Sequence, residues 1–291
     1  MEVLVLAPKE KKENIDYGDC FIINDNGIVT VYDCGSDELA EQVLDYLKNR
    51  NITDKINVIL SHNDEDHFNG IPKLIENGVV NSVTTLLLLK YKNLIIDKID
   101  DKRVNNNSLA NNIKDLYCNI SSLEGKGLRD ALDRNIVLSP NLKIVGPSLD
   151  YFIEAVAKQF TPNESNNINK STIMNAISVQ LEISFGDKKL LLTGDADFAA
   201  FDDKIRYYDA IQLPHHGNSD MAKLIFEKNA KRNEVIYIVS DNKGALINGG
   251  SSDLKTSGHI VKTTKNGAFL VTPELIGAKR KVALKNEIYP F

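Results

Sequence analysis

His62, Asp64, Asp66 and His67 supply two imidazoles and two carboxylates within six residues, in the run Ser-His-Asn-Asp-Glu-Asp-His. In an extended chain His62 and Asp64 project to the same side, whereas Asp66 and His67 can turn toward a second point. Imidazole nitrogens and carboxylate oxygens are ligands for divalent metal ions, so this loop could serve two neighbouring ions. The alternative interpretation is a solvated acidic loop, because Asp and Asn are common turn residues.

Further polar residues follow other apolar runs of the sequence. His215 and His216 lie in Leu-Pro-His-His-Gly, Asp195 ends Leu-Thr-Gly-Asp, and Asp33 ends Val-Tyr-Asp. Each of these acidic residues alone would be interpreted as an ordinary turn residue. Together with the loop at 61–67, they place polar groups at the carboxyl ends of several apolar strands. This is how a hydrolytic site with two metal ions is assembled.

Strands and helices must position these groups. Hydrophobic patterning predicts strands at 3–6, 20–23, 29–32, 58–60, 177–183, 189–192, 210–213 and 235–239, with a hairpin turn at 185–187. Apolar residues at helical spacing predict a helix at 36–50 with Ser36 as its N-cap, and further helices around 113–117 and 221–225. Residues 91–135 are interpreted as an insertion and 161–170 as a surface loop. No fixed-period repeat or Pro/Ser-rich linker occurs, so a single domain over residues 1–291 is expected.

Composition limits the classes of function. The 291 residues, 42% of them hydrophobic, can fill a sizeable core. The net charge of −5 provides no overall positive excess for binding nucleic acid. Such a substrate would therefore need local basic residues, and several occur within 90–103 and 279–281. The three cysteines form no CxxC pair and indicate reduced thiols. The apolar run at the N-terminus is too short for a signal sequence, and no run is long enough to span a membrane, so a cytoplasmic protein is expected.

The motif His62-x-Asp64-x-Asp66-His67 resembles the metal-binding signature of the metallo-β-lactamase superfamily, in the variant with Asp at the third position. Other short motifs are similar, in order and character, to its ComEC-like branch, named for DNA-uptake channel proteins. They are Tyr17-Gly18-Asp19-Cys20, Asp33-Cys34-Gly35, Asn69-Gly70-Ile71, Val145-Gly146-Pro147, Asn175-Ala176-Ile177-Ser178, Leu192-Thr193-Gly194-Asp195, Pro214-His215-His216-Gly217 and Ser257-Gly258-His259. The resemblance covers about residues 17–272.

This resemblance implies an α/β fold, a four-layer αββα sandwich with its metal site at one edge of the two sheets. It implies two divalent metal ions, Zn²⁺ or Mn²⁺. The implied ligands are His62 and Asp64 for one ion, Asp66 and His67 for the other, Asp195 as the bridge, and His215 or His216 to complete the second ion's shell. Many superfamily members have a further histidine ligand, but no histidine occurs here between 68 and 214, so Asn175 or a water would fill the gap. The oxygen-rich ligand set favours harder ions such as Mn²⁺ and leaves Zn²⁺ open.

The implied activity is that of a metal-dependent hydrolase, a phosphodiesterase or nuclease that attacks nucleic-acid or nucleotide phosphodiesters through a metal-bound hydroxide. The catalytic candidates are Asp66, His215, His216 and His259. The leaving group would receive its proton from whichever of His215 and His216 is not a ligand, or from His259. The alternatives are hydrolysis of a small ester, thioester, lactone or lactam, and a defence component regulated by a protein partner that the sequence does not identify. Redox chemistry at a di-iron centre is disfavoured, and the transport role of uptake channels is not transferred because no membrane segment is expected.

Overall fold

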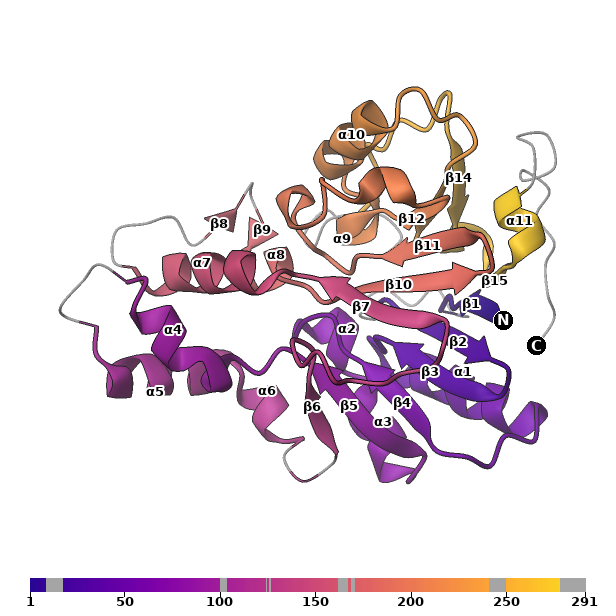
Figure 1. Cartoon of the computed structure of the whole chain (residues 1–291). Coiled ribbons are helices and arrows are strands. Elements are labelled where there is room, and N and C mark those ends of the chain that lie inside the picture. Colours follow the sequence, from indigo (N-terminus) through magenta and orange to yellow (C-terminus); the bar gives the residue numbers. More distant parts are fainter. Residues whose placement is uncertain are drawn as a thin grey trace.

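Two facing β-sheets form the centre of the molecule, and helices cover the outer face of each (Figure 1). The structure is a computed structural model and describes residues 1–8, 18–99, 104–123, 125, 127–161, 167–168, 171–240 and 250–277. The predicted four-layer αββα arrangement is confirmed. Of the helices that the structure describes, none combines the length and the hydrophobicity needed to cross a membrane.

The first sheet contains seven strands within the described residues, in the order β15-β1-β2-β3-β4-β5-β6. Their bounds are β1 (Glu2–Val5), β2 (Phe21–Asp25), β3 (Ile28–Tyr32), β4 (Ile56–Ile59), β5 (Val80–Thr85), β6 (Leu128–Asp130) and β15 (Phe269–Val271). Neighbours from β15 to β3 are antiparallel, and neighbours from β3 to β6 are parallel. The β2–β3 hairpin turns at Asn26 and Gly27, with φ of 54° and 96°. Asparagine followed by glycine is favoured in such a two-residue turn because both residues tolerate positive φ.

The second sheet contains six strands in the described part of the chain, in the order β14-β13-β12-β11-β10-β7. Their bounds are β7 (Leu142–Gly146), β10 (Gln180–Phe185), β11 (Lys188–Leu192), β12 (Ala210–Gln212), β13 (Ile236–Val239) and β14 (Ile260–Thr263). Strands β7, β10 and β11 are antiparallel, and β11 to β14 are parallel. The strand predicted at 177–183 begins only at Gln180. Ile177 and Ser178 instead continue the hydrogen bonds of a short helix, donating to Ile173 and Asn175.

Helices α1 and α3 cover the first sheet, and α10 covers the second (Figure 1). The helices are α1 (Asp37–Asn49), α2 (Glu65–Phe68), α3 (Ile71–Glu76), α4 (Lys92–Ile96), α5 (Asn106–Leu116), α6 (Cys118–Ser121), α7 (Leu149–Phe160), α8 (Ile173–Ala176), α9 (Pro214–Gly217), α10 (Ser219–Lys228) and α11 (Pro273–Gly277). The 3₁₀ turns are η1 (Leu88–Tyr91), η2 (Phe198–Ala200), η3 (Ile205–Tyr207) and η5 (Thr264–Asn266). Ser36 is the predicted N-cap of α1, and its hydroxyl accepts a hydrogen bond from the backbone N–H of Leu39 at 3.3 Å.

A continuous apolar core joins the two sheets. Val31 and Val58 of the first sheet and Leu181 of the second are fully buried in the same cluster. The hydroxyl of Tyr32 crosses between the sheets and donates a hydrogen bond to the backbone oxygen of Val179 at 2.6 Å. Burial of this apolar surface holds the sheets together, so the residues that follow their parallel strands keep fixed positions relative to one another.

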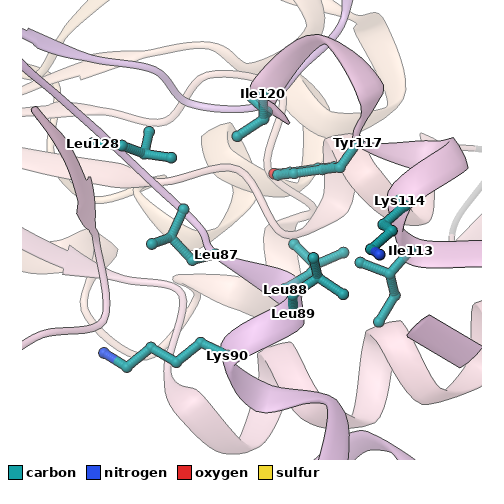
Figure 2. Close-up of a pocket in the computed structure, with 9 residues that line it drawn as sticks. All are labelled: Leu87, Leu88, Leu89, Lys90, Ile113, Lys114, Tyr117, Ile120 and Leu128. Carbon is teal, nitrogen blue, oxygen red and sulfur yellow. The ribbon is translucent and has the colours of Figure 1, made fainter. Parts of the chain in front are cut away.

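The described residues of the segment 91–135, which the sequence analysis interpreted as an insertion, include α4, α5, α6 and β6. The side chain of Asn105 caps α5 by accepting hydrogen bonds from the backbone N–H groups of Asn107 and Ser108, both at 3.0 Å. Together with η1, the segment lines a mostly apolar cavity that is half open to solvent (Figure 2). Most of the loop predicted at 161–170, and the basic residues Lys102, Arg103 and 279–281, lie outside the described residues. Residues 167–168 form β8 (Asn167–Ile168), which pairs with β9 (Ser171–Thr172).

Candidate metal centre

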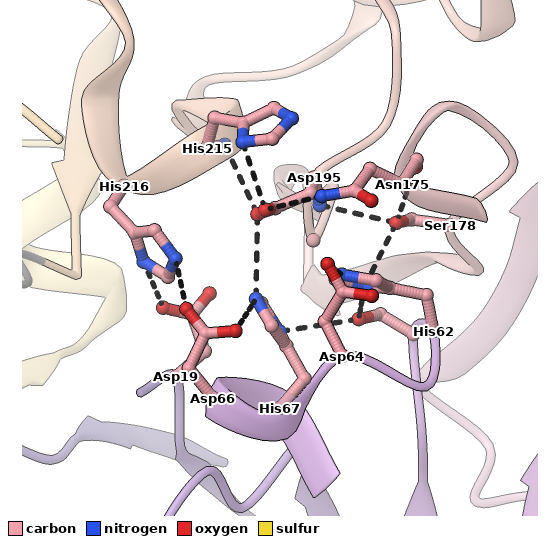
Figure 3. A network of polar contacts seen from close by, with 12 residues as sticks. Asp19, His62, Asp64, Asp66, His67, Asn175, Ser178, Asp195, His215 and His216 are labelled. Carbon is pink, nitrogen blue, oxygen red and sulfur yellow. Dashed lines mark hydrogen bonds and ion pairs between the residues drawn. The ribbon is translucent and has the colours of Figure 1, made fainter. Parts of the chain in front are cut away.

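The polar residues singled out from the sequence follow the carboxyl ends of strands from both sheets. Asp33 follows β3 and His62 follows β4 in the first sheet, whereas Asp195 follows β11 and His216 follows β12 in the second. Within each pair the two strands are parallel neighbours. The four chain segments therefore meet at one edge of the sandwich, and Figure 3 shows the side chains of His62, Asp195 and His216 turned toward a common centre.

His62 and His67 are both fully buried, and each is held through its Nδ1 atom. The Nδ1 atom of His67 lies 2.9 Å from Oδ2 of Asp33. The Nδ1 atom of His62 lies 2.9 Å from the hydroxyl of Ser61 and 3.2 Å from that of Ser178. Contacts at Nδ1 fix the orientation of each ring and leave Nε2 as the atom available to a metal ion.

The Nε2 atoms of these two histidines point into a space between carboxylates (Figure 3). Nε2 of His67 lies 3.5 Å from Oδ1 of Asp195 and 3.9 Å from Oδ1 of Asp66. Nε2 of His62 lies 3.5 Å from Oδ2 of Asp64. Both Nε2 atoms are buried and form no hydrogen bond within the described residues. Because a buried polar atom without a partner is costly, this arrangement of donors fits a bound cation.

His216 reaches the same centre from the second sheet. Both His215 and His216 have φ of 53°, a left-handed conformation that costs a residue with a side chain about 1–2 kcal/mol. The ring of His216 is fully buried, with Nδ1 3.0 Å from Oδ1 of Asp19 and Nε2 3.0 Å from Oδ2 of Asp66. Backbone strain of this kind is concentrated at functional sites, and here it turns an imidazole back toward the loop that follows β4.

His215 lies on the other side of Asp195. Its backbone N–H donates to Oδ1 of Asp195 at 3.1 Å, and its Nδ1 lies 3.1 Å from Oδ2. The side chain is 13% exposed, whereas those of the other three histidines of the centre are fully buried. The side-chain amide of Asn175 donates to Oδ2 of Asp195 at 3.4 Å. The structure thus places Asn175, expected to compensate for the missing histidine, beside the aspartate that was expected to bridge the ions.

Charges within the centre shift its pKa values in opposite directions. Burial alone would lower the pKa of His67, but the carboxylates of Asp195 and Asp66 raise it well above its ordinary value. Burial would likewise lower the pKa of His216, but the carboxylate of Asp19 outweighs this effect and raises the pKa. Burial would raise the pKa values of Asp195 and Asp66, but the neighbouring histidines hold both well below the ordinary range. Ionised carboxylates therefore face protonated imidazoles, and a cation would take the place of those protons.

Two overlapping groups of described residues have ligand atoms close enough to hold a metal ion. The ligand atoms of His62, His67 and Asp195 lie within 4.8 Å of one another, as do those of Asp19, His67 and His216. Sequence reasoning missed Asp19 as a site residue. Its only signal was the Tyr-Gly-Asp-Cys motif, because Asp19 and His216 are 197 residues apart and only the fold brings them together.

His259 is not brought together with the other predicted catalytic residues. Its ring stacks on Phe226 with centroids 3.8 Å apart, and its edge faces Tyr237 at 5.7 Å. His259 precedes β14, whereas the centre lies at the carboxyl ends of the parallel strands. The structure therefore places His259 in a stacked aromatic group at the other end of the second sheet.

The backbone of Asp66 rests on two glycines. A Cβ atom at Gly18 would lie 2.0 Å from the carbonyl oxygen of Asp66, and a Cβ atom at Gly35 would lie 1.9 Å from it. The same carbonyl accepts a hydrogen bond from the backbone N–H of Asp19 at 3.0 Å. Only residues without a side chain allow this close approach, which fixes Asp66 and Asp19 relative to each other.

A cleft of about 500 Å³ opens beside the metal loop, and helix α6 forms its opposite wall. The loop contributes Asp64 and Asp66, and α6 contributes Cys118 and Asn119. The side-chain amide of Asn119 donates to the backbone oxygen of Asn63 at 2.8 Å, and the amide of Asn63 donates to Oδ1 of Asn119 at 3.3 Å. This reciprocal pair attaches the segment 91–135 to the loop residue between His62 and Asp64.

Two facing mixed sheets covered by helices, with a buried His/Asp centre at one edge, define a protein of metallo-β-lactamase fold. The family model described as "Metallo-beta-lactamase superfamily" matches residues 14–104. The structure is similar to the metallo-β-lactamase fold protein YhfI from Bacillus subtilis, with a TM-score of 0.50, 14% identity, and coverage of 93% of this chain and 100% of that one. It is also similar to the short form of human tRNase Z, with a TM-score of 0.45, 9% identity, and coverage of 94% of this chain and 99% of that one. No curated protein matches the sequence.

Proposed function

We propose that this chain is a metal-dependent hydrolase that cleaves phosphodiesters in nucleotides or nucleic acid, and that it stands in the ComEC-like branch of the superfamily. The observation that carries the proposal is the pair of buried Nε2 atoms on His62 and His67, which face carboxylates without forming hydrogen bonds. The ordered motifs between residues 17 and 272 support the branch.

The donor set fits two divalent cations, Zn²⁺ or Mn²⁺. His62 and Asp64 would hold one cation and Asp66, His67 and His216 the other, with Asp195 between them. Two bound cations of this kind lower the pKa of a coordinated water and neutralise charge on a substrate oxygen. Asp33 and Asp19 would keep the rings of His67 and His216 in their binding orientations.

His215 is the residue best placed to move a proton. It is the only partly exposed imidazole among the four described histidines of the centre, and Asp195 orients it through Nδ1. A ring held in this way can donate a proton to the leaving oxygen of a bound substrate. His216 lacks that freedom because both of its ring nitrogens already contact carboxylates.

The described wall of the cleft favours small phosphodiesters over long duplex nucleic acid. Its polar lining consists of carboxylates and of the amides of Asn63, Asn69 and Asn119, with no lysine or arginine among the described lining residues. Amide N–H groups can donate hydrogen bonds to phosphoryl oxygens, but most of the affinity for a long polyanion comes from lysine and arginine. The same lining is compatible with the second candidate function, hydrolysis of a small uncharged ester, thioester or lactone.

A substrate panel tests the proposal. Purified protein loaded with Mn²⁺ or Zn²⁺ is offered bis-p-nitrophenyl phosphate, single-stranded DNA, RNA, p-nitrophenyl acetate and a lactone. We expect phosphodiester hydrolysis that Asp66→Ala abolishes and that Glu76→Gln, at an exposed residue of α3 outside the lining of the cleft, leaves unchanged. Cleavage of the acetate or lactone alone would select the second candidate, and protein that binds neither metal would refute both.

A further inference from the structure

Residues of η1 and of the segment 91–135 line a second cavity, which is half open to solvent and separate from the cleft of the metal centre. It has a volume of about 190 Å³ and lies between η1, α5, α6 and β6 (Figure 2). Leu88, Ile113, Tyr117 and Ile120 line it and are at most 5% exposed. These four side chains belong to the core and are already fixed by packing.

We propose that this cavity binds a small amphiphilic anion, with an alkyl body inside the cavity and the anionic head group beside Lys114. An apolar cavity of about 150 Å³ stays dry and is large enough to bind benzene. A cavity of about 190 Å³ accordingly accommodates an apolar body of roughly six to eight carbons. Leucine, isoleucine and tyrosine walls offer few hydrogen-bond partners to water, so an alkyl chain is the better occupant.

The charge of the head group is argued from the two lysines that line the cavity. The ammonium group of Lys90 lies 2.6 Å from Oδ2 of Asp130 and is thereby neutralised. Lys114 is exposed and forms no ion pair with any described residue. Figure 2 shows its side chain next to Ile113 and Leu88, with the nitrogen near the apolar wall. A carboxylate or phosphate at this position would pair with a cation that forms no ion pair within the described part of the chain.

The cavity is distinct from the metal centre, although they share a short helical segment. Tyr117 and Ile120 line the cavity, whereas Cys118 and Asn119, between them in the sequence, line the cleft. The proposed ligand therefore does not contact the metal ligands. The proposal stands whether or not the chain hydrolyses phosphodiesters.

Isothermal titration of the full chain with octanoate tests the ligand class. We expect saturable binding of one octanoate, and binding of butyrate weaker by roughly 200-fold, because each buried methylene contributes about 0.8 kcal/mol. Octylamine, which carries the same chain with a positive head group, should bind more weakly than octanoate. Absence of octanoate binding, or equal binding of octylamine, would overturn the proposal.

Variants locate the site. Leu128→Phe and Leu87→Phe each fill the cavity from a different side and should abolish octanoate binding, whereas Leu94→Phe, at an exposed leucine outside the lining, should not. Lys114→Gln should weaken binding about two- to fivefold, and Lys48→Gln on α1 should leave it unchanged. Circular dichroism identifies any variant that fails to fold, and Zn²⁺ titration checks that the metal centre is intact. Octanoate binding that survives in both folded cavity-filling variants would place the ligand elsewhere and refute the assignment.

Discussion

Replacing Gly35 with alanine tests whether the close approach of backbones at the metal loop positions the metal ligands. Gly35 lies directly against the carbonyl group of Asp66. The three atoms nearest to an added Cβ are backbone atoms of Asp66 and Gly18, and none belongs to a flexible side chain. The new methyl group cannot be accommodated by rotation of a side chain, so the backbone itself must move.

The size of that movement follows from the structure. The added Cβ would lie 1.9 Å from the oxygen of Asp66, which is 1.1 Å less than the 3.0 Å below which Cβ contacts are essentially never found. Functional groups in such sites must be held within about 0.5 Å of their productive positions. We therefore expect the variant to lose about 1–3 kcal/mol of unfolding free energy through overpacking. A displacement of about 1 Å at Asp66 should also weaken metal binding and any hydrolysis by roughly 100-fold.

Urea unfolding and titration with Zn²⁺ and Mn²⁺ measure the two effects separately. Gly277→Ala is the matched control, because a Cβ atom there meets nothing within 4 Å. It should leave metal affinity unchanged and should leave stability unchanged or raise it by at most about 1 kcal/mol. A Gly35→Ala variant that folds and binds both metals as tightly as the unmodified chain would show that the Asp66 backbone is not held where the structure places it.

Three further predictions concern the same centre. Asp33→Asn removes the carboxylate that orients His67, so Zn²⁺ affinity measured by titration should fall by about 10- to 100-fold while the circular dichroism spectrum stays unchanged; an unchanged affinity would contradict the orienting role. The pKa values of His67 and His216 are raised, so these rings are protonated near pH 7 and must release protons to bind a cation. Metal affinity should therefore increase as pH rises, with proton release seen as a dependence of the binding enthalpy on the buffer; affinity that is independent of pH would contradict this. In the native protein Cys118 should react with Ellman's reagent and the two buried cysteines only after unfolding; three fast thiols in native protein would be inconsistent with the fold.

The fold was largely predictable because its strands and helices carry strong local signals. The run Val58-Ile59-Leu60 is apolar throughout, α1 has both an N-cap serine and helical spacing, and the Asn26-Gly27 pair is typical of a hairpin turn. The start of β10 was predicted too early. Ile177 and Val179 alternate with polar residues as a strand would, but local hydrogen bonds to α8 compete successfully with sheet pairing.

The centre was predictable only where its residues are neighbours in sequence. The loop at 61–67 and the His215-His216 pair are visible as clusters, and the structure brings them together with Asp195. Asp19 and the orienting contact of Asp33 are long-range consequences of the fold, so no local pattern could assign them. His259 was predicted as a catalytic candidate because it lies within a motif, and in the structure its ring stacks on Phe226 instead of facing the other candidates.

The reciprocal amide pair between Asn63 and Asn119 has a consequence for how such a protein can change. The candidate metal ligands follow strands of the two sheets. The opposite wall of the cleft is formed by α6, which lies outside the two sheets and contacts the metal loop through this amide pair. Sequence drift within residues 91–135 can therefore remodel what enters the cleft while the ligand-bearing strands stay as they are. New substrate selectivity would then arise without changes to the two sheets, provided that the hydrogen bonds between Asn119 and Asn63 are retained.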